Sequence, residues 1–177
     1  MKAFPVYPPA SATCRIGGLA WIPNEHGHVL TLSVNYVHPN GDYQLPGGVA
    51  KLQQSSLDAL VSHARHEIGV SLKPVRLLGT DWMPHAPSAP TVMEQNFVYL
   101  CDVVPADTKF ALPDPVEGAD RVLSGYLWQT PRTAELTMRP YQFRRFVGLW
   151  QAWRENDVAV LHAGRPALFS EAAGVSA

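Results

Sequence analysis

Three side chains that can carry a proton or bind a metal ion, His63, His66 and Glu67, lie within one five-residue stretch, HARHE. In an α-helix, which turns by about 100° per residue, they would share one flank roughly 100° wide. Imidazole nitrogens favour zinc, manganese, iron, cobalt or nickel over magnesium, and the same groups can transfer protons. The pattern therefore indicates a metal site with two histidines and one carboxylate, or an acid–base group. A solvated helix face is the alternative without function.

Local signals place this stretch on a helix over residues 55–68. Ser55 followed by Asp58 resembles a capping box, and Gly69 is a natural helix stop. Apolar residues then recur at helical spacing, and the predicted buried stripe is Leu57, Leu60, Val61, Ala64 and Ile68. His63 and Glu67 lie closer to this stripe than His66. We therefore expect His63 and Glu67 to be partly buried and to face the Gly47–Gly48 turn, with His66 more exposed.

Strand signals dominate the rest of the chain. Residues 14–23 and 28–37 flank the turn NEHG and predict a hairpin, and a second turn at 38–42 leads into YQLP. Further strands are expected at 75–83 and 93–104, at a segment ending in 125–129, and in a closing hairpin at 158–169. A second helix is expected at 140–156, with an apolar face formed by Phe143, Phe146, Val147, Trp150 and Trp153.

These elements predict an α+β domain or a three-layer α/β/α sandwich, with a mixed β-sheet between helices. The expected single domain covers residues 14–169, preceded by an N-terminal arm at 1–13 and followed by a flexible tail at 170–177. Because 177 residues suffice for one well-packed domain and are marginal for two, the length agrees with this division.

Composition narrows the expected partners and location. A formal net charge of −1 argues against a nucleic-acid partner. The sequence contains no run of 18 apolar residues, so we expect no membrane-spanning helix. Cys14 and Cys101 lie in strand-like runs without metal-ligand spacing, so we expect two reduced core thiols. The first residues lack the apolar run of a signal peptide. We expect a cytoplasmic protein with a small-molecule partner and no organic cofactor, and leave open whether it forms a homodimer.

Residues 43–70, YQLPGGVAKLQQSSLDALVSHARHEIGV, resemble the box of Nudix hydrolases. That box reads Gly, five residues, Glu, seven residues, Arg-Glu-apolar-any-Glu-Glu-any-Gly-apolar. With Gly48 at its first glycine, the spacing is intact but four of the five charged positions differ. In order, these five positions are Gln54, Ser62, His63, His66 and the retained Glu67. The similarity continues through the late strand YLWQTP and the hairpin LHAGRP, over residues 14–168, and implies the Nudix fold.

The resemblance also implies which side chains form the site. Catalytic candidates are Glu67, His63 and Glu94, and the last of these stands where many Nudix proteins carry an acid. Candidates for substrate contact are Gln54, His85, Gly47 and Gly48, and the metal candidates are His63, His66 and Glu67. Nudix hydrolases hold Mg²⁺ with a cluster of glutamates, because this ion prefers hard oxygen ligands. A divalent cation here would be a transition metal, or weakly bound Mg²⁺ or Mn²⁺.

The resemblance implies a divergent Nudix-type hydrolase that acts on a diphosphate-linked or related small molecule, with weak or altered metal dependence. Two alternatives stay open: the fold reassigned to non-hydrolytic or metal-independent small-molecule chemistry, and a catalytically silent ligand-binding module. Because several acids of the box are missing, we expect poor Mg²⁺-dependent hydrolysis of ordinary nucleotides. The few cations near the box also argue against a polyphosphate site.

Overall fold

The computed structural model describes residues 14–34, 42–84, 92–114 and 123–167. The predicted arm, the whole of the predicted tail and His85 lie outside these ranges. The elements are, in order, β1 (Cys14–Trp21), β2 (Val29–Val34), β3 (Asp42–Gln44), β4 (Gly47–Val49), α1 (Ser56–Ile68), β5 (Pro74–Met83), β6 (Met93–Cys101), β7 (Leu123–Gln129), α2 (Pro131–Thr137), α3 (Pro140–Glu155), β8 (Ala159–His162) and β9 (Arg165–Pro166).

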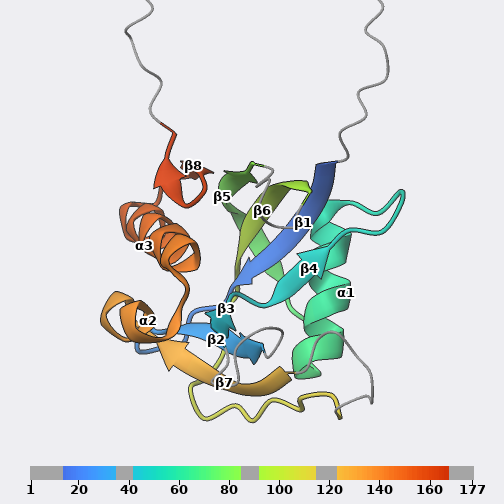
Figure 1. Ribbon diagram of the computed structural model, residues 1–177. Helices are drawn as coiled ribbons and strands as arrows, with labels where there is room; N and C mark the ends of the chain where they lie inside the picture. Colours follow the sequence, from blue (N-terminus) through green and yellow to red (C-terminus); the bar gives the residue numbers. More distant parts are fainter. Residues whose placement is uncertain (1–13, 35–41, 85–91, 115–122, 168–177) are drawn as a thin grey trace, which may run out of the picture.

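The strands form a mixed sheet and a smaller antiparallel one. The larger sheet has the order β4-β1-β6-β5-β8-β9, with β1–β6 and β5–β8 parallel and the other pairs antiparallel. The smaller sheet has the order β3-β2-β7. Figure 1 shows α1 and α3 on opposite sides of the larger sheet. The predicted mixed sheet between helices is therefore confirmed, whereas the smaller sheet was not separated from it in the sequence.

The predicted hairpin at NEHG closes only beside its turn. Pro23 and Val29 form an isolated antiparallel bridge, and the amide of Leu30 donates to the carbonyl oxygen of Ile22 at 3.0 Å. Beyond these residues β1 and β2 separate into different sheets. Every residue of β2 is buried, so both faces of this strand need covering layers. Burial of both faces thus overrides the local pairing that the turn suggests.

The helix signals around α1 are confirmed, with one correction. The Ser55 hydroxyl accepts a hydrogen bond from the amide of Asp58 at 3.1 Å, and Gly69 ends the helix at a φ of 71°. The buried face consists of Ala59, Leu60, Ala64, Glu67 and Ile68. Leu57 was expected in this face and instead lies over a shallow surface hollow beside Pro74. Glu67 is turned inward because it bonds the Gly47 amide, which rotates the buried face away from Leu57.

Helix α3 is also confirmed in extent, and its buried face is rotated from the predicted one. Its buried residues are Gln142, Arg145, Phe146, Leu149 and Ala152. Val147, which was predicted to be on the apolar face, is exposed. The rotation follows from a polar contact, since Arg145 Nε donates to the buried Asp81 Oδ2 at 2.6 Å. Helix α2 and strand β4 were not predicted.

Two apolar clusters fill the interior, one associated with α1 and the other with α3. The α1 cluster includes Leu60, Ala64 and Ile68 of α1 together with Leu30 and Leu32 of β2. The α3 cluster includes Phe146 and Leu149 of α3, together with Trp21, Leu78 and Val98 from the larger sheet. Ala20 belongs to the first cluster and Trp21 to the second, because successive side chains of a strand point to opposite faces.

The two cysteines differ from each other. Cys101 is a buried free thiol as predicted, and burial raises its pKa to about 12, with a further contribution from the charge of Asp102. Cys14 is also free but exposed, so its assignment to the core was wrong. No helix in the described part of the chain is long and apolar enough to cross a membrane.

The buried Asp81–Arg145 pair generates a stability prediction. Asp81→Ala would leave the Arg145 guanidinium buried without its carboxylate, which typically costs about 3–5 kcal/mol. We expect a loss of this size in the free energy of unfolding, measured by denaturant titration. Lys73→Ala is the control, since it removes the exposed Lys73–Asp102 pair at 3.8 Å and should change this free energy little. Equal effects of the two substitutions would contradict the role given to Asp81.

Candidate functional site

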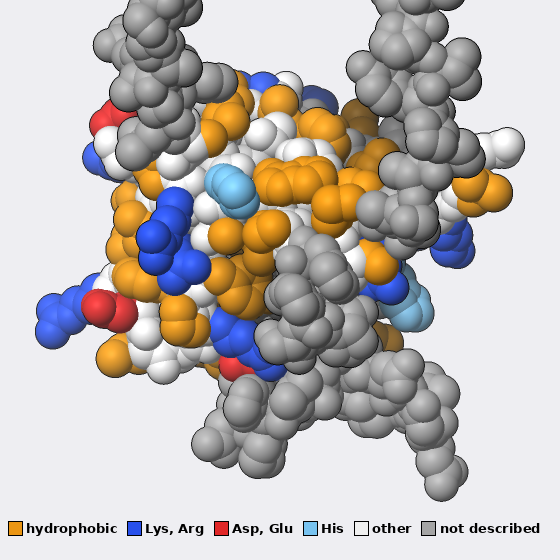
Figure 2. All heavy atoms as spheres, turned by 45° about the horizontal axis from the view of Figure 1, so that its top comes forward, with side chains coloured by type: hydrophobic (Ala, Val, Ile, Leu, Met, Phe, Trp, Pro, Cys, Tyr) orange, Lys and Arg blue, Asp and Glu red, His pale blue; other side chains and the backbone are white. Residues whose placement is uncertain are grey.

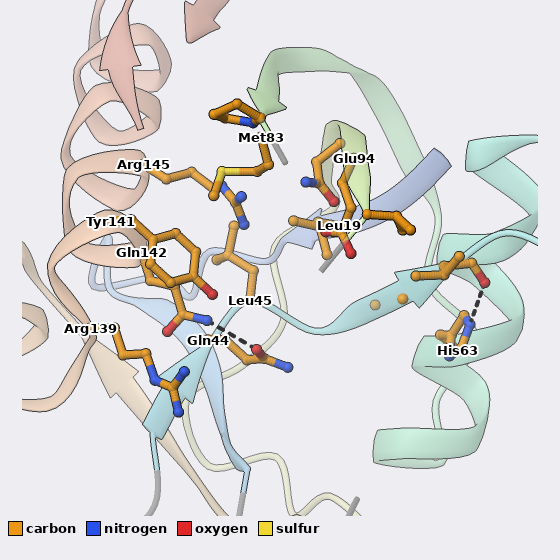
Figure 3. A pocket seen from close by; sticks show the side chains of 16 residues that line it. Leu19, Gln44, Leu45, His63, Met83, Glu94, Arg139, Tyr141, Gln142 and Arg145 are labelled. Carbon is orange, nitrogen blue, oxygen red and sulfur yellow. Dashed lines mark hydrogen bonds between the residues drawn. The ribbon is translucent and has the colours of Figure 1, made fainter. Parts of the chain in front are cut away.

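A cavity of about 630 Å³ opens between the β4–α1 unit and the first turns of α3 (Figure 3). Its polar lining side chains come from four elements or their ends: Gln44 from β3, His63 from α1, Glu94 and Asn96 from β6, and Arg139, Tyr141, Gln142 and Arg145 from the start of α3. Leu19, Leu45, Val49 and Met83 supply apolar surface. The size and the mixture suit a small organic ligand.

The backbone at Gly47 forms the edge of the cavity and requires glycine. Its φ is 127°, and a Cβ atom there would lie 2.2 Å from the carbonyl oxygen of Gly18. The Gly47 amide donates to Glu67 Oε2 at 2.8 Å, and Glu67 is only 2% exposed. The retained glutamate of the box is thus a buried acceptor that holds the turn against α1.

His63 contacts the same turn through its ring. A Cβ atom at Gly48 would lie 2.6–2.7 Å from three atoms of the imidazole, so the ring packs directly over that glycine. His63 Nε2 is 3.1 Å from the carbonyl oxygen of Val49 (Figure 3). His63 is half-buried, Glu67 is buried and His66 is exposed, which agrees with the predicted order.

The predicted metal site is not assembled by these side chains. In residues 14–34, 42–84, 92–114 and 123–167, no three His, Cys, Asp or Glu side chains converge as a set that could hold a metal ion. His63 and Glu67 are directed to the backbone of the turn, while His66 faces solvent. His63, His66 and Glu67 thus form no metal site among the described residues, and their assignment as metal ligands stays a prediction.

Gln54 is also engaged away from the cavity. Its Oε1 accepts from the Lys51 amide at 2.9 Å, and its Nε2 donates to Ser62 Oγ at 3.1 Å. Gln54 and Ser62 line a separate shallow hollow on the outer side of α1. The structure therefore gives Gln54 a role in the β4–α1 loop and does not bring it to the cavity. His85 lies outside the described residues.

Glu94 does line the cavity, and the strand that carries it brings a second polar residue there. Glu94 and Asn96 are two positions apart on β6, so they share one face of the sheet. Asp81 of β5 pairs with Asn96 in register and places its carboxylate beneath Arg145. Asn96 was missed in the sequence, although the two-residue alternation from Glu94 would have found it.

The wall formed by α3 was also missed. Arg139 is bound by the carboxylate of Asp42, and Arg145 by that of Asp81. The Arg145 guanidinium carbon lies 5.7 Å from the centre of the Tyr141 ring, and its terminal N–H groups make no hydrogen bond within the described residues. Gln142 Nε2 donates to Gln44 Oε1 at 3.1 Å (Figure 3). One signal in the sequence could have predicted this wall: Arg145 directly precedes Phe146 and lies within an otherwise apolar helix face.

Tyr141 is a hydrogen-bond donor across the neutral pH range. Burial raises the pKa of its hydroxyl above the ordinary value. Among the smaller influences, the charges of Arg145 and Arg139 lower this pKa, whereas that of Glu94 raises it. Glu94 and Tyr141 both line the cavity, so the carboxylate charge is one of the smaller causes that raise this pKa.

Basic side chains are interspersed with apolar ones on the face shown in Figure 2, and few acidic side chains are visible among the described residues there. No acidic surface of the kind that concentrates divalent cations gathers on that face of the described chain.

No protein-family model and no curated protein matches the chain. Among solved structures, the MutT protein from Methanosarcina mazei Go1 matches with a TM-score of 0.63 at 22% identity, over 83% of this chain and 98% of that one. A NUDIX hydrolase from Nitrosomonas europaea gives 0.58 at 15% identity, over 82% and 91% of the two chains. An ADP-ribose pyrophosphatase from Streptococcus suis 89-1591 gives 0.54 at 18%, over 85% and 99%. The predicted Nudix fold is confirmed; at these identities the likeness shows the fold alone.

The link between Glu94 and Tyr141 can be tested by titration. Glu94→Gln removes a negative charge that disfavours the phenolate, so the pKa of Tyr141 should fall. The measurement is the ultraviolet absorbance of tyrosinate against pH, with the Tyr141 signal taken as the difference from the same background carrying Tyr141→Phe. Glu135→Gln, an exposed charge removal on α2, is the control and should leave this pKa unchanged. An unchanged or higher Tyr141 pKa in Glu94→Gln would contradict this influence of the Glu94 charge.

Proposed function

We propose that this chain binds a compact organic molecule with one anionic group and transforms it by acid–base chemistry, without a cluster of divalent cations. The observation that carries the proposal is the contrast between the two walls. Cationic and hydrogen-bonding side chains gather at the start of α3, whereas most of the acids that a magnesium cluster needs are replaced on α1.

Charge around the cavity favours a ligand with one negative group over a polyphosphate. Arg139 and Arg145 are each bound by a carboxylate, from Asp42 and Asp81, and Glu94 adds a third negative group. The set therefore offers no net positive charge to a chain of phosphates. One anionic group can still bind the remaining N–H donors of an arginine, because a guanidinium presents several donors in a fixed geometry.

The chemistry in this proposal uses groups that line the cavity. The Glu94 carboxylate can accept a proton from a substrate atom within hydrogen-bond reach, which makes it the candidate general base. The Tyr141 hydroxyl, protonated at neutral pH, can donate to a substrate oxygen on which negative charge develops. His63 and Glu67 then act as positioning residues, since they hold the Gly47–Gly48 turn at the edge of the cavity.

A second candidate is a divergent hydrolase of a diphosphate-linked small molecule, with weak or altered metal dependence. The retained contact between Glu67 and Gly47 and the position of Glu94 in the cavity favour it. Solved structures named MutT, NUDIX hydrolase and ADP-ribose pyrophosphatase have the same fold. In this case Glu94 would orient or deprotonate the attacking water.

Magnesium binding and hydrolysis separate the two candidates. Calorimetric titration of the full chain with Mg²⁺ should show no saturable binding. A panel of nucleotide sugars, dinucleoside polyphosphates and nucleoside triphosphates should turn over far below ordinary enzyme rates of about 1–10³ s⁻¹. The reason is that loss of one proton-transfer group commonly costs about 10²–10⁴-fold, and here several acids differ together. Turnover in the ordinary range would favour the hydrolase and show that the acidic cluster is dispensable.

Restoring the Nudix-box side chains on α1 and in the loop before it tests whether the chain is an eroded hydrolase or acts by metal-independent chemistry. The quadruple variant Gln54→Glu, Ser62→Arg, His63→Glu and His66→Glu supplies the side chains of the Nudix box at their expected positions. If the chain acts by metal-independent chemistry, this variant should gain Mg²⁺ affinity by calorimetry but little diphosphate cleavage. Circular dichroism should confirm that it is folded, and Ser62→Arg alone is the control. Efficient cleavage by the quadruple variant would instead indicate an eroded hydrolase.

A further inference from the structure

Arg145 is a buried cation whose hydrogen bonds within the protein use only part of its guanidinium. The side chain is 11% exposed, and its Nε donates to Asp81 Oδ2 at 2.6 Å. The two terminal nitrogens make no hydrogen bond within the described residues. Because burying a cation is costly unless its donors are paired, these free donors call for a partner from outside the chain.

The terminal nitrogens of Arg145 are accessible from the cavity. Arg145 lines the cavity, and Figure 3 shows its side chain reaching into it from α3. In the described part of the chain, the fully buried atoms without a hydrogen-bond partner include amide atoms of Asn96 and Gln142 but no nitrogen of Arg145. The terminal nitrogens are therefore unpaired without being sealed from the accessible surface, so a ligand in the cavity can contact them.

The surroundings of Arg145 fix the direction of its guanidinium. Asp81 is fully buried and accepts a second hydrogen bond from the Gly164 amide at 3.0 Å. The guanidinium carbon lies 5.7 Å from the centre of the Tyr141 ring. With Nε held by Asp81, the side chain presents its two terminal nitrogens as donors in one plane. Such a pair of donors matches the two oxygens of a carboxylate.

Arg139, the second arginine of the cavity, is the weaker candidate for this contact. Its Nε and one terminal nitrogen both bind the same oxygen of Asp42, and its side chain is 34% exposed. Solvent screens charges at such a position, so an anion gains less there than beside the desolvated guanidinium of Arg145.

The rest of the cavity favours a carboxylate over a phosphate. A phosphate monoester carries a charge of about −1.5 to −2 at neutral pH, whereas a carboxylate carries a single negative charge. Asp81 already neutralises Arg145, and Glu94 adds a negative charge in the same cavity. Apolar lining side chains, including Leu45 and Met83, suit the remainder of the ligand.

We infer that Arg145 binds the carboxylate of a small monocarboxylic acid with an apolar body. This inference rests on the proposed function, and it names both the anionic group of the ligand and the side chain that holds it. Arg145 is a binding residue in this scheme, while proton transfer stays with Glu94 and Tyr141.

The test uses the full chain at neutral pH and three probes with the same ring: benzoate, the neutral benzamide and phenyl phosphate. Binding is followed by two-dimensional NMR of the protein amides. Benzoate should shift the signals of cavity residues and bind in the millimolar range, as expected for a ligand of about nine non-hydrogen atoms. Benzamide should bind about tenfold more weakly, because it lacks the charge that pairs with the guanidinium. Phenyl phosphate should also bind more weakly than benzoate.

The side-chain nitrogens of Arg145 report the contact directly. In the unmodified chain, benzoate should shift their NMR signals and leave those of Arg154, an exposed residue on the same helix, unchanged. This measurement does not depend on the folding of any variant.

A paired substitution assigns the preference for benzoate to Arg145. Arg145→Gln alone would leave Asp81 buried without its cation, so it is combined with Asp81→Asn, which removes both charges together. The double variant should bind benzoate about tenfold more weakly and benzamide about as well as before. Arg154→Gln makes the same charge change at an exposed position of α3 and should leave both affinities unchanged. Circular dichroism should confirm that both variants are folded.

The outcomes distinguish failure of this inference from failure of the proposed function. If benzamide binds as tightly as benzoate, if the Arg145 signals stay in place, or if the folded double variant keeps the preference, the assignment to Arg145 is wrong and a small-molecule cavity remains. Tighter binding of phenyl phosphate would make the anionic group a phosphate and overturn the inference alone. If no probe shifts the cavity residues, both proposals are overturned. A preference for benzoate that shifts the Arg145 signals supports the inference, even where the double variant does not fold.

Discussion

The buried ion pair between Asp81 and Arg145 fixes the relation of α3 to the sheet, and the cavity depends on that relation. Asp81 also accepts from the Gly164 amide at 3.0 Å, so one carboxylate joins β5, α3 and the closing β8–β9 turn. A buried carboxylate needs such partners because removal from water is costly. By holding Arg145, Asp81 places the first turns of α3, with Tyr141 and Gln142, opposite the face of β6.

The opposite wall of the cavity, formed by β4 and α1, is held by hydrogen bonds and packing in which Glu67 is the one charged side chain named here. Glu67 accepts from the Gly47 amide, the ring of His63 packs over Gly48 and reaches the Val49 carbonyl, and Gln54 joins the following loop to Ser62. In a glutamate-rich box, like charges this close would repel one another unless a cation lay between them. The replacements at positions 54 and 63 remove that repulsion. Gln54, Ser62 and His63 supply direct hydrogen bonds, so the turn and the helix stay together through the chain's own groups.

The sequence was informative where signals are local. Ser55, Gly69 and the apolar spacing predicted α1 because capping and periodicity act within one or two turns. Glu94 was found through its place relative to the box. Arg145 and Asn96 were missed because their roles depend on partners from distant segments, namely Asp81 on β5 and the space above Gly17 on β1. The rotated face of α3 has the same cause: a hydrophobic pattern does not show that an arginine will be buried on a carboxylate.

The division of the interior into two apolar clusters has a consequence for how such a protein can diverge. The α1 cluster supports the wall that carries the box-like segment, and the α3 cluster supports the wall that carries the proposed ligand contacts. Substitutions in well-separated regions usually act independently on stability. Substitutions on the α1 side and substitutions on the α3 side can therefore accumulate independently, because the larger sheet lies between the two clusters. A lineage on this scaffold could exchange its chemistry while keeping its ligand, or exchange its ligand while keeping its chemistry.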